Sequence, residues 1–134
     1  METCIFCKII AGKIPCHKVR ETPYSLAFLD IFPHAKGHTV VIPKIHAELL
    51  EQLDQKHTEH LLEDVKETIN KLNQKLHPLG FNIGWNNGKG AGQVVPHLHI
   101  HIFPRYEHDG GESMHHIIKN PGSIPVDELA KLFK

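Results

Sequence analysis

The sequence has no excess of charge of either sign and no long apolar run. Its 15 Lys and Arg residues balance 15 Asp and Glu residues, which argues against a nucleic-acid-binding surface or a polybasic membrane patch. No stretch reaches the roughly 20 apolar residues that a membrane span needs. Residues 1–10 also lack the basic start and apolar centre of a signal peptide. We therefore expect a soluble, cytoplasmic protein with neither nucleic acid nor membrane among its partners.

Cysteine is scarce, and its count of three is odd. In a reducing compartment, Cys4 and Cys7 of the C-x-x-C pair are expected to be thiols or metal ligands rather than a disulfide. Two cysteines make only half of a closed zinc site, which needs four ligands. The pair alone therefore also fits two small buried residues on a short helix, and Cys16 is expected to be inert.

A chain of 134 residues predicts a single domain. The hydrophobic periodicity predicts one long amphipathic helix that begins after Asp54 and ends near residues 77–80. Short helices are expected at 5–10 and 126–133, and five strands at 18–21, 24–30, 38–42, 81–86 and 96–104. Because most strands follow one another without intervening helices, the predicted class is α+β with a mostly antiparallel sheet.

Three histidines alternate with apolar residues over 96–104. Alternation with a period of two indicates a strand with one buried face. The residues expected on that buried face are Leu98, Ile100 and Ile102. The opposite face then carries His97, His99 and His101. Side chains two residues apart on a strand are about 6.6–6.8 Å apart, so three imidazoles are expected in a row, an arrangement suited to handling a proton, a metal or an anion.

Two kinds of chemistry use such a row. One is a three-histidine metal site with an open position for water. The other is covalent catalysis, in which one imidazole attacks and the others position the substrate and stabilise charge. The Gly-rich loop at 87–93 favours the second, because successive N–H groups in such a loop bind anions such as phosphate. Glu107 follows His101 too distantly for the usual H-x-H…Glu metal pattern.

The segment from Gly92 to His101 (GQVVPHLHIH) resembles the histidine triad, or HIT, family of nucleotide-binding proteins and hydrolases. The segments 26–31 and 37–44 add to the likeness, and 4–10 resembles the start of bacterial members. The resemblance implies one HIT domain over 1–134, with a core at about 3–105 and a C-terminal tail at 106–134. It also implies a HIT-like fold with a five-stranded antiparallel sheet, one long helix and short terminal helices, and a homodimer.

The resemblance further implies a role for each matching residue. His99 matches the nucleophile, which attacks the α-phosphorus of a purine nucleotide and forms a nucleotidyl-histidine that water resolves. His101 matches the histidine beside the leaving group, His97 and His38 complete the histidine set, and Asp30 matches the acid that binds the ribose. The apolar slot for the base corresponds to Phe6, Ile9, Phe28, Leu29 and Ile31. Positions that line the phosphate site correspond to Asn86, Gly92 and Gln93.

The resemblance also implies a metal. In bacterial members with a similar start, the two cysteines are completed by two histidines, so that the ligands here are Cys4, Cys7, His46 and His97. Such a Cys₂His₂ set implies a structural zinc. The ion would attach the N-terminus to the sheet and hold one histidine of the triad from behind.

A neutral imidazole is a suitable attacking group for phosphate, and crowded rings resist multiple protonation. Nearby N–H donors can stabilise the phosphate oxygens, so we expect no magnesium requirement for the chemistry. Val94 stands where the family often has Ser or Thr and cannot donate to a leaving group. Phosphoramidates and dinucleoside polyphosphates both remain open as substrates. A non-catalytic nucleotide sensor or adaptor and a three-histidine metal-dependent hydrolase remain as alternative functions.

Overall fold

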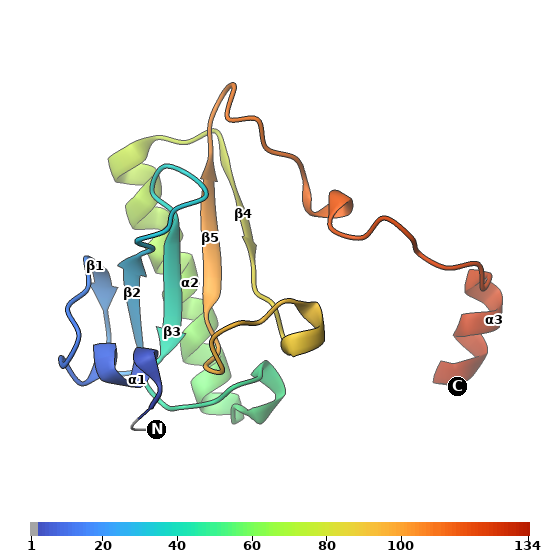
Figure 1. The fold of residues 1–134 in the computed structure, drawn as a ribbon, viewed down its shortest axis with the longest axis horizontal. Helices are drawn as coiled ribbons and strands as arrows, with labels where there is room; N and C mark the ends of the chain where they lie inside the picture. Colours follow the sequence, from blue (N-terminus) through green and yellow to red (C-terminus); the bar gives the residue numbers. More distant parts are fainter. Residues whose placement is uncertain (1–2) are drawn as a thin grey trace.

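Five antiparallel strands form one sheet in the order β1-β2-β3-β5-β4 in the computed structural model, which describes residues 3–134 (Figure 1). The strands are β1 (Lys18–Glu21), β2 (Ser25–Leu29), β3 (Thr39–Pro43), β4 (Gly80–Gly84) and β5 (Ile100–Arg105). The helices are α1 (Ile5–Ile10), α2 (Gln55–Leu76) and α3 (Val126–Ala130). Four 3₁₀ turns lie at Leu50–Gln52, Lys89–Ala91, Met114–His116 and Lys131–Phe133. The α+β class with a five-stranded antiparallel sheet is confirmed.

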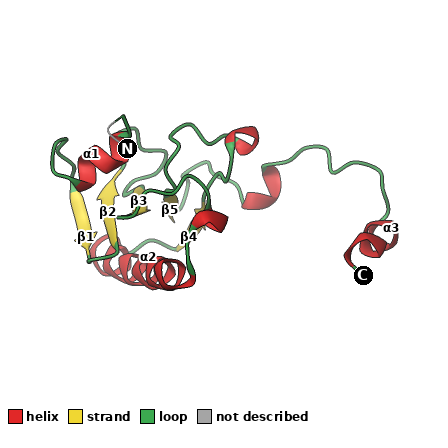
Figure 2. Cartoon of the chain, turned by 90° about the horizontal axis from the view of Figure 1, so that it is seen from below, coloured by secondary structure: helices red, strands yellow, loops and turns green. Residues whose placement is uncertain are grey.

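The long helix α2 has the start that the sequence predicts. The Asp54 side chain accepts a hydrogen bond from the His57 amide at 2.8 Å and caps the first turn. The helix ends where His77 adopts a left-handed conformation with φ of 51°. The sheet lies between α2 on one face and the short α1 on the other (Figure 2).

Strand alternation divides the core between these two faces. Ala27 and Val41 pack with the apolar residues of α2. Their neighbours Phe28 and Val40 point to the other face, where Phe6 of α1 packs against them. This second face also carries His101 of β5 and the preceding His99, whose ring packs against Phe6, so α1 is part of the wall around them.

Asp64 of α2 is buried and joins the helix to the β1–β2 hairpin. Its carboxylate accepts hydrogen bonds from Arg20 at 3.1 Å and from Thr22 and Ser25 at 2.6 Å each. Burial raises the pKa of Asp64, but these three donors outweigh burial and hold the pKa below its usual range. The negative charge is therefore retained and fixes the hairpin on the helix.

The histidine segment differs from the expected strand over 96–104, because β5 begins only at Ile100. Before it the chain bends: the His97 amide donates to the Val95 carbonyl at 2.8 Å, and the Leu98 amide donates to the Ala47 carbonyl at 2.7 Å. Leu98, Ile100 and Ile102 are buried as predicted. The row of three imidazoles is only partly formed, since His97 lies in the bend and its ring is fully buried.

The tail leaves the body at the end of β5. Arg105 anchors its first turn by donating to the Asp109 carboxylate at 2.8 and 3.0 Å and to the Glu112 carbonyl at 2.9 Å. Residues 107–134 are all exposed, and α3 lies away from the sheet in both views (Figures 1 and 2). Within residues 3–134, no helix combines the length and apolarity needed to cross a bilayer.

Candidate active site

His99 lies just before β5 with its two ring nitrogens in different environments. Nδ1 is 2.6 Å from the carbonyl oxygen of His97, which only accepts, so Nδ1 carries the proton and donates it. In the neutral ring, Nε2 then carries a free lone pair. The ring of Phe6 packs edge-on against His99 at 5.1 Å, and the ring of His101 lies 5.0 Å away. The arrangement fixes the ring and leaves Nε2 as the nitrogen that can act as a nucleophile.

A chain of hydrogen bonds fixes the tautomer of His101. The backbone N–H of His34 donates to Nδ1 of His38 at 3.2 Å, which leaves the His38 proton on Nε2. That proton is donated to Nδ1 of His101 at 2.9 Å. His101 therefore carries its proton on Nε2, for which no acceptor exists within residues 3–134. The group is placed to donate a proton to a bound molecule.

Burial keeps the imidazole rings of His38 and His101 uncharged. It lowers the pKa of His101 to about 4, helped by the neighbouring His99 and His38 and opposed by Asp30. Burial also lowers the pKa of His38, again against the opposing effect of Asp30. Both rings are therefore neutral at pH 7, in agreement with the hydrogen-bond directions.

The low pKa of His101 predicts a loss of stability in acid. The unfolded chain takes up a proton at this histidine near pH 6.5, whereas the folded protein takes it up only near pH 4. Stability is therefore complete above about pH 6.5 and falls as the pH drops to about 4, by about 3 kcal/mol from this group. Urea unfolding of wild type and His101→Asn across this range measures the effect, and the wild type should lose more free energy of unfolding. Equal losses in the two proteins would contradict it.

Asp30 and the apolar slot lie beside the histidines. Asp30 accepts from the Phe32 amide at 2.9 Å through Oδ1, and its Oδ2 is 3.6 Å from His38 Nε2. Phe6 and Ile9 of α1 pack against the buried Phe28. These contacts bring together one carboxylate and an apolar wall on the face that carries His99.

Two residues predicted for the slot are placed differently. Leu29 follows Phe28 in β2, so the pleat puts its side chain on the face that Ala27 shares with α2. Only its main chain can reach the slot. Ile31 follows the strand and is 71% exposed, so it lies at the rim.

The Gly-rich loop brings Asn86 next to Gly92. Gly92 has φ of 101°, and a Cβ added there would lie 3.6 Å from Nδ2 of Asn86. The Gln93 side chain is used within the loop: its oxygen accepts from the Gly88 amide at 2.8 Å and its nitrogen donates to the carbonyls of Glu48 and Val95. The Gln93 amide also donates within the loop, to the Gly88 carbonyl at 3.2 Å, so Gln93 stabilises the loop with both its side chain and its main chain.

Four side chains meet at the start of α1. Cys4 Sγ lies 3.4 Å from His97 Nδ1, while Cys7 Sγ lies 3.3 Å from His46 Nδ1 and 3.6 Å from His97 Nδ1. The two imidazole nitrogens are 3.2 Å apart. A tetrahedral zinc with ordinary bond lengths would have N–S edges of about 3.6 Å and an N–N edge of about 3.4 Å. The four atoms therefore fit one tetrahedral metal ion.

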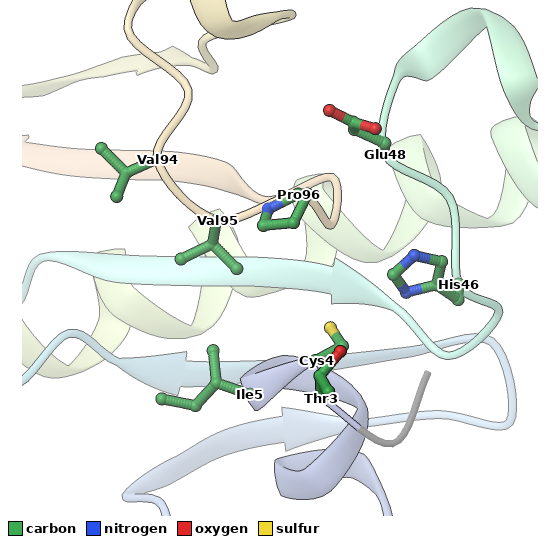
Figure 3. Close-up of a pocket in the computed structure, with 8 residues that line it drawn as sticks. All are labelled: Thr3, Cys4, Ile5, His46, Glu48, Val94, Val95 and Pro96. Atoms are coloured by element: carbon green, nitrogen blue, oxygen red, sulfur yellow. The ribbon is translucent and has the colours of Figure 1, made fainter.

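The protonation of His97 supports this fit. Its Nε2 donates to the Pro43 carbonyl at 3.0 Å, so Nδ1 carries a lone pair directed at the cysteines. Burial lowers the pKa of His97 to about 4, and metal-bound histidines commonly donate their other nitrogen to a carbonyl in this way. Figure 3 shows Cys4 and His46 facing one another beside a cavity of about 290 Å³.

A second group, Asp30, His38 and His101, is close enough to suggest a metal site. The hydrogen bond from the His34 amide excludes it, because that bond keeps a proton on His38 Nε2, the nitrogen that faces the group. A metal needs a lone pair at that position. The three-histidine metal site that the sequence left open is not formed either, because His97 turns toward the cysteines while His99 and His101 stay together.

Sequence reasoning missed several residues around the site. The His34 amide fixes the His38 tautomer, although His34 reads as an ordinary turn residue. Trp85, Phe103, Met114 and Ile117 line a cavity that contains His101. Only the spacing of His34, four residues before His38 in a turn, offered a signal. Nothing in the tail sequence indicates that it passes this cavity.

The fold and site define a class of small α+β domains that present neutral imidazoles beside a Gly-rich loop and an apolar slot. The HIT domain family model matches residues 11–108, and the chain belongs to this family.

Relatives cover most of the chain. An uncharacterized HIT-like protein of Methanocaldococcus jannaschii is 46% identical, with 98% of each chain covered. An adenosine 5′-monophosphoramidase of Schizosaccharomyces pombe is 45% identical, over 81% of this chain and 79% of the relative. A crystal structure of a HIT family protein from Bacillus anthracis has a TM-score of 0.82 and 36% identity, over 98% of this chain and 93% of that one.

Proposed function

We propose that this protein hydrolyses purine nucleotide derivatives at the α-phosphate through a nucleotidyl intermediate on His99. The observation that carries the proposal is the 2.6 Å hydrogen bond from His99 Nδ1 to the His97 carbonyl, which places the lone pair of the neutral tautomer on Nε2. In this reaction Nε2 attacks the phosphorus and the bond to the leaving group breaks. His101 gives its Nε2 proton to the departing atom. Water then displaces His99 from phosphorus and returns a proton to His101.

The substrate class that we propose is a nucleoside phosphoramidate. An amine must gain a proton as it leaves, and His101 holds one on the nitrogen that has no acceptor within residues 3–134. A 45% identical relative is named for its action on adenosine monophosphoramidates. We assign the base to the slot of Phe6, Ile9 and Phe28, and the ribose to Asp30. The amides of Val94 and Val95 have no protein acceptor within residues 3–134 and suit phosphate oxygens.

We also propose that zinc occupies the site of Cys4, Cys7, His46 and His97. Two thiolates and two imidazoles at tetrahedral spacing are typical of structural zinc. Four protein ligands leave no open position for water, so the ion would hold α1 and His97 in place rather than act on phosphate. We expect the chemistry itself to need no magnesium.

The test of the covalent mechanism is to trap the intermediate. Pure protein is mixed with adenosine phosphoramidate carrying a radioactive α-phosphorus and quenched in alkali, where a phosphorus–nitrogen bond to histidine survives. The label should remain on the protein and map to the peptide that contains His99. A His17→Ala variant, altered at an exposed histidine, should label normally.

The alternatives give different results in the same experiment. A non-catalytic nucleotide sensor or adaptor would bind AMP without retaining label. A three-histidine metal hydrolase would hydrolyse the phosphoramidate without labelling the protein, and brief chelator treatment would stop the hydrolysis. Either result would reject the covalent mechanism.

We further propose that the protein is a homodimer of one HIT domain in the cytoplasm. The outer strand β4 is paired on one side only, so its other side is open to pairing with a strand of a second copy. The 3₁₀ turn at Lys131–Phe133, which follows the tail helix α3, also leaves Leu132 and Phe133 exposed. A second copy is the partner that we propose for these surfaces.

A further inference from the structure

A cavity of about 520 Å³ lies beside His101, between β4, β5 and the first part of the tail. His101 and Phe103 of β5 form its floor, and their rings are parallel within 5° with centroids 5.7 Å apart. His99 is not part of the lining. The cavity therefore adjoins the proton donor of the proposed reaction and does not contact the nucleophile.

In-line displacement at phosphorus puts the leaving group on the side opposite the attacking atom. Attack comes from His99, and the leaving atom takes its proton from His101. The leaving group accordingly departs past His101 into this cavity. We propose that the cavity is the leaving-group site, and that it selects apolar amines that are neutral or positively charged over leaving groups that carry phosphate or carboxylate. This inference rests on the proposed function.

The walls explain the apolar part of this preference. Trp85 from the end of β4 and Phe103 from β5 face the cavity, and the tail adds Met114 and Ile117. Without a ligand, Met114 is 57% exposed and Ile117 is 76% exposed. A carbon chain on the leaving amine would cover these side chains and remove apolar surface from water.

The charge of the lining explains why leaving groups that carry phosphate or carboxylate are disfavoured. The lining contains two carboxylates, Asp30 and Glu112, whereas no lysine or arginine is among the described residues that line it. Asp30 serves the ribose in the proposed function, so Glu112 is the charge that a leaving group meets. The histidines of the lining are His34, His38 and His101, and the last two are neutral at pH 7 for the reasons given above. A second nucleotide or a polyphosphate would bring negative charge against these carboxylates.

The position of Glu112 depends on Arg105. Arg105 donates to the Glu112 carbonyl at 2.9 Å and to Asn82 of β4 at 2.6 Å, which holds the tail at the cavity. Its own charge is compensated by the Asp109 carboxylate, which it contacts with two nitrogens. The Glu112 carboxylate has one ion-pair partner within residues 3–134, the exposed His116 at 3.8 Å.

The test compares adenosine phosphoramidates that differ only in the leaving amine: diaminobutane, butylamine and aminobutyrate, with the unsubstituted phosphoramidate as reference. We expect kcat/KM for the diaminobutane compound to exceed that for the aminobutyrate compound by about tenfold. Glu112→Gln should reduce this ratio to about threefold or less. Glu107→Gln, which removes an exposed carboxylate of the tail outside the lining, should leave it unchanged.

A double variant tests the apolar wall. Met114→Ala with Ile117→Ala should lower kcat/KM for the butylamine compound by about fivefold relative to the unsubstituted one. The inference would be overturned, while the proposed function stands, by either of two results. One is a kcat/KM for the diaminobutane compound within twofold of that for the aminobutyrate compound. The other is a ratio of these two kcat/KM values that Glu112→Gln does not change. Failure to hydrolyse even the unsubstituted compound would overturn the proposed function, and this inference with it.

Discussion

Replacing His99 by alanine should lower kcat for adenosine phosphoramidate by a factor on the order of 10⁴ or more. The substitution removes the atom that attacks phosphorus, and no other imidazole can take its place. His101 presents a protonated nitrogen to the site, and His97 is turned toward the cysteines. AMP binding should stay within about threefold of wild type, because Asp30 and the slot around Phe6 remain. Steady-state kinetics and calorimetric titration with AMP measure the two effects.

Two further variants sharpen this experiment. His17→Ala removes an exposed imidazole and should keep full activity. His99→Gly leaves a space for free imidazole, which should restore part of the activity when added to the buffer. A His99→Ala protein whose kcat stays within tenfold of wild type would rule out the assigned nucleophile.

Removing both cysteine ligands should give the largest loss of stability. Cys4→Ser with Cys7→Ser abolishes the tetrahedral set, and with it the stabilisation that a tightly bound ion adds to the folded state. We expect a loss of about 4 kcal/mol and a fall in melting temperature of about 10 °C or more. AMP binding should also weaken, because α1 carries Phe6 and Ile9 of the slot. Metal analysis measures the loss of zinc, calorimetry the loss of stability, and titration with AMP the weaker binding.

Cys16→Ser is the matched control, since Cys16 is a partly buried thiol outside the metal group. It should keep one equivalent of zinc and nearly the wild-type melting temperature. Wild-type protein purified without chelator that holds less than a tenth of an equivalent of zinc, with Cys4 and Cys7 freely titratable, would refute the metal site.

Local patterns in the sequence predicted much of the fold. The Asp54 cap and the spacing of Leu61, Val65 and Leu72 placed α2, because both signals depend only on residues within a few turns. The burial of Ile100 and Ile102 followed from the alternation of β5. The HIT resemblance was confirmed by the family match over residues 11–108.

Other features depend on contacts between distant segments and were not predictable locally. His97 leaves the expected row because its ring contacts Pro43 and the cysteine pair. Pro43 is 54 residues away in the sequence, and Cys4 is 93 residues away. The tautomer of His101 depends on the His34 amide, and a main-chain donor leaves no trace in residue type. The tail lies at the cavity because Arg105, which bonds to Asn82 of β4, also donates to the Glu112 carbonyl.

His97 belongs to two networks at once. Its ring faces the cysteines, while its carbonyl oxygen accepts a hydrogen bond from His99 Nδ1. With the proposed zinc bound, metal occupancy and the orientation of the proposed nucleophile are expected to be thermodynamically coupled through this one residue. In a double-mutant cycle, substitutions at Cys4 and His99 would interact rather than sum. Loss of the proposed ion would therefore have to be compensated by other contacts that keep the His99 ring aligned.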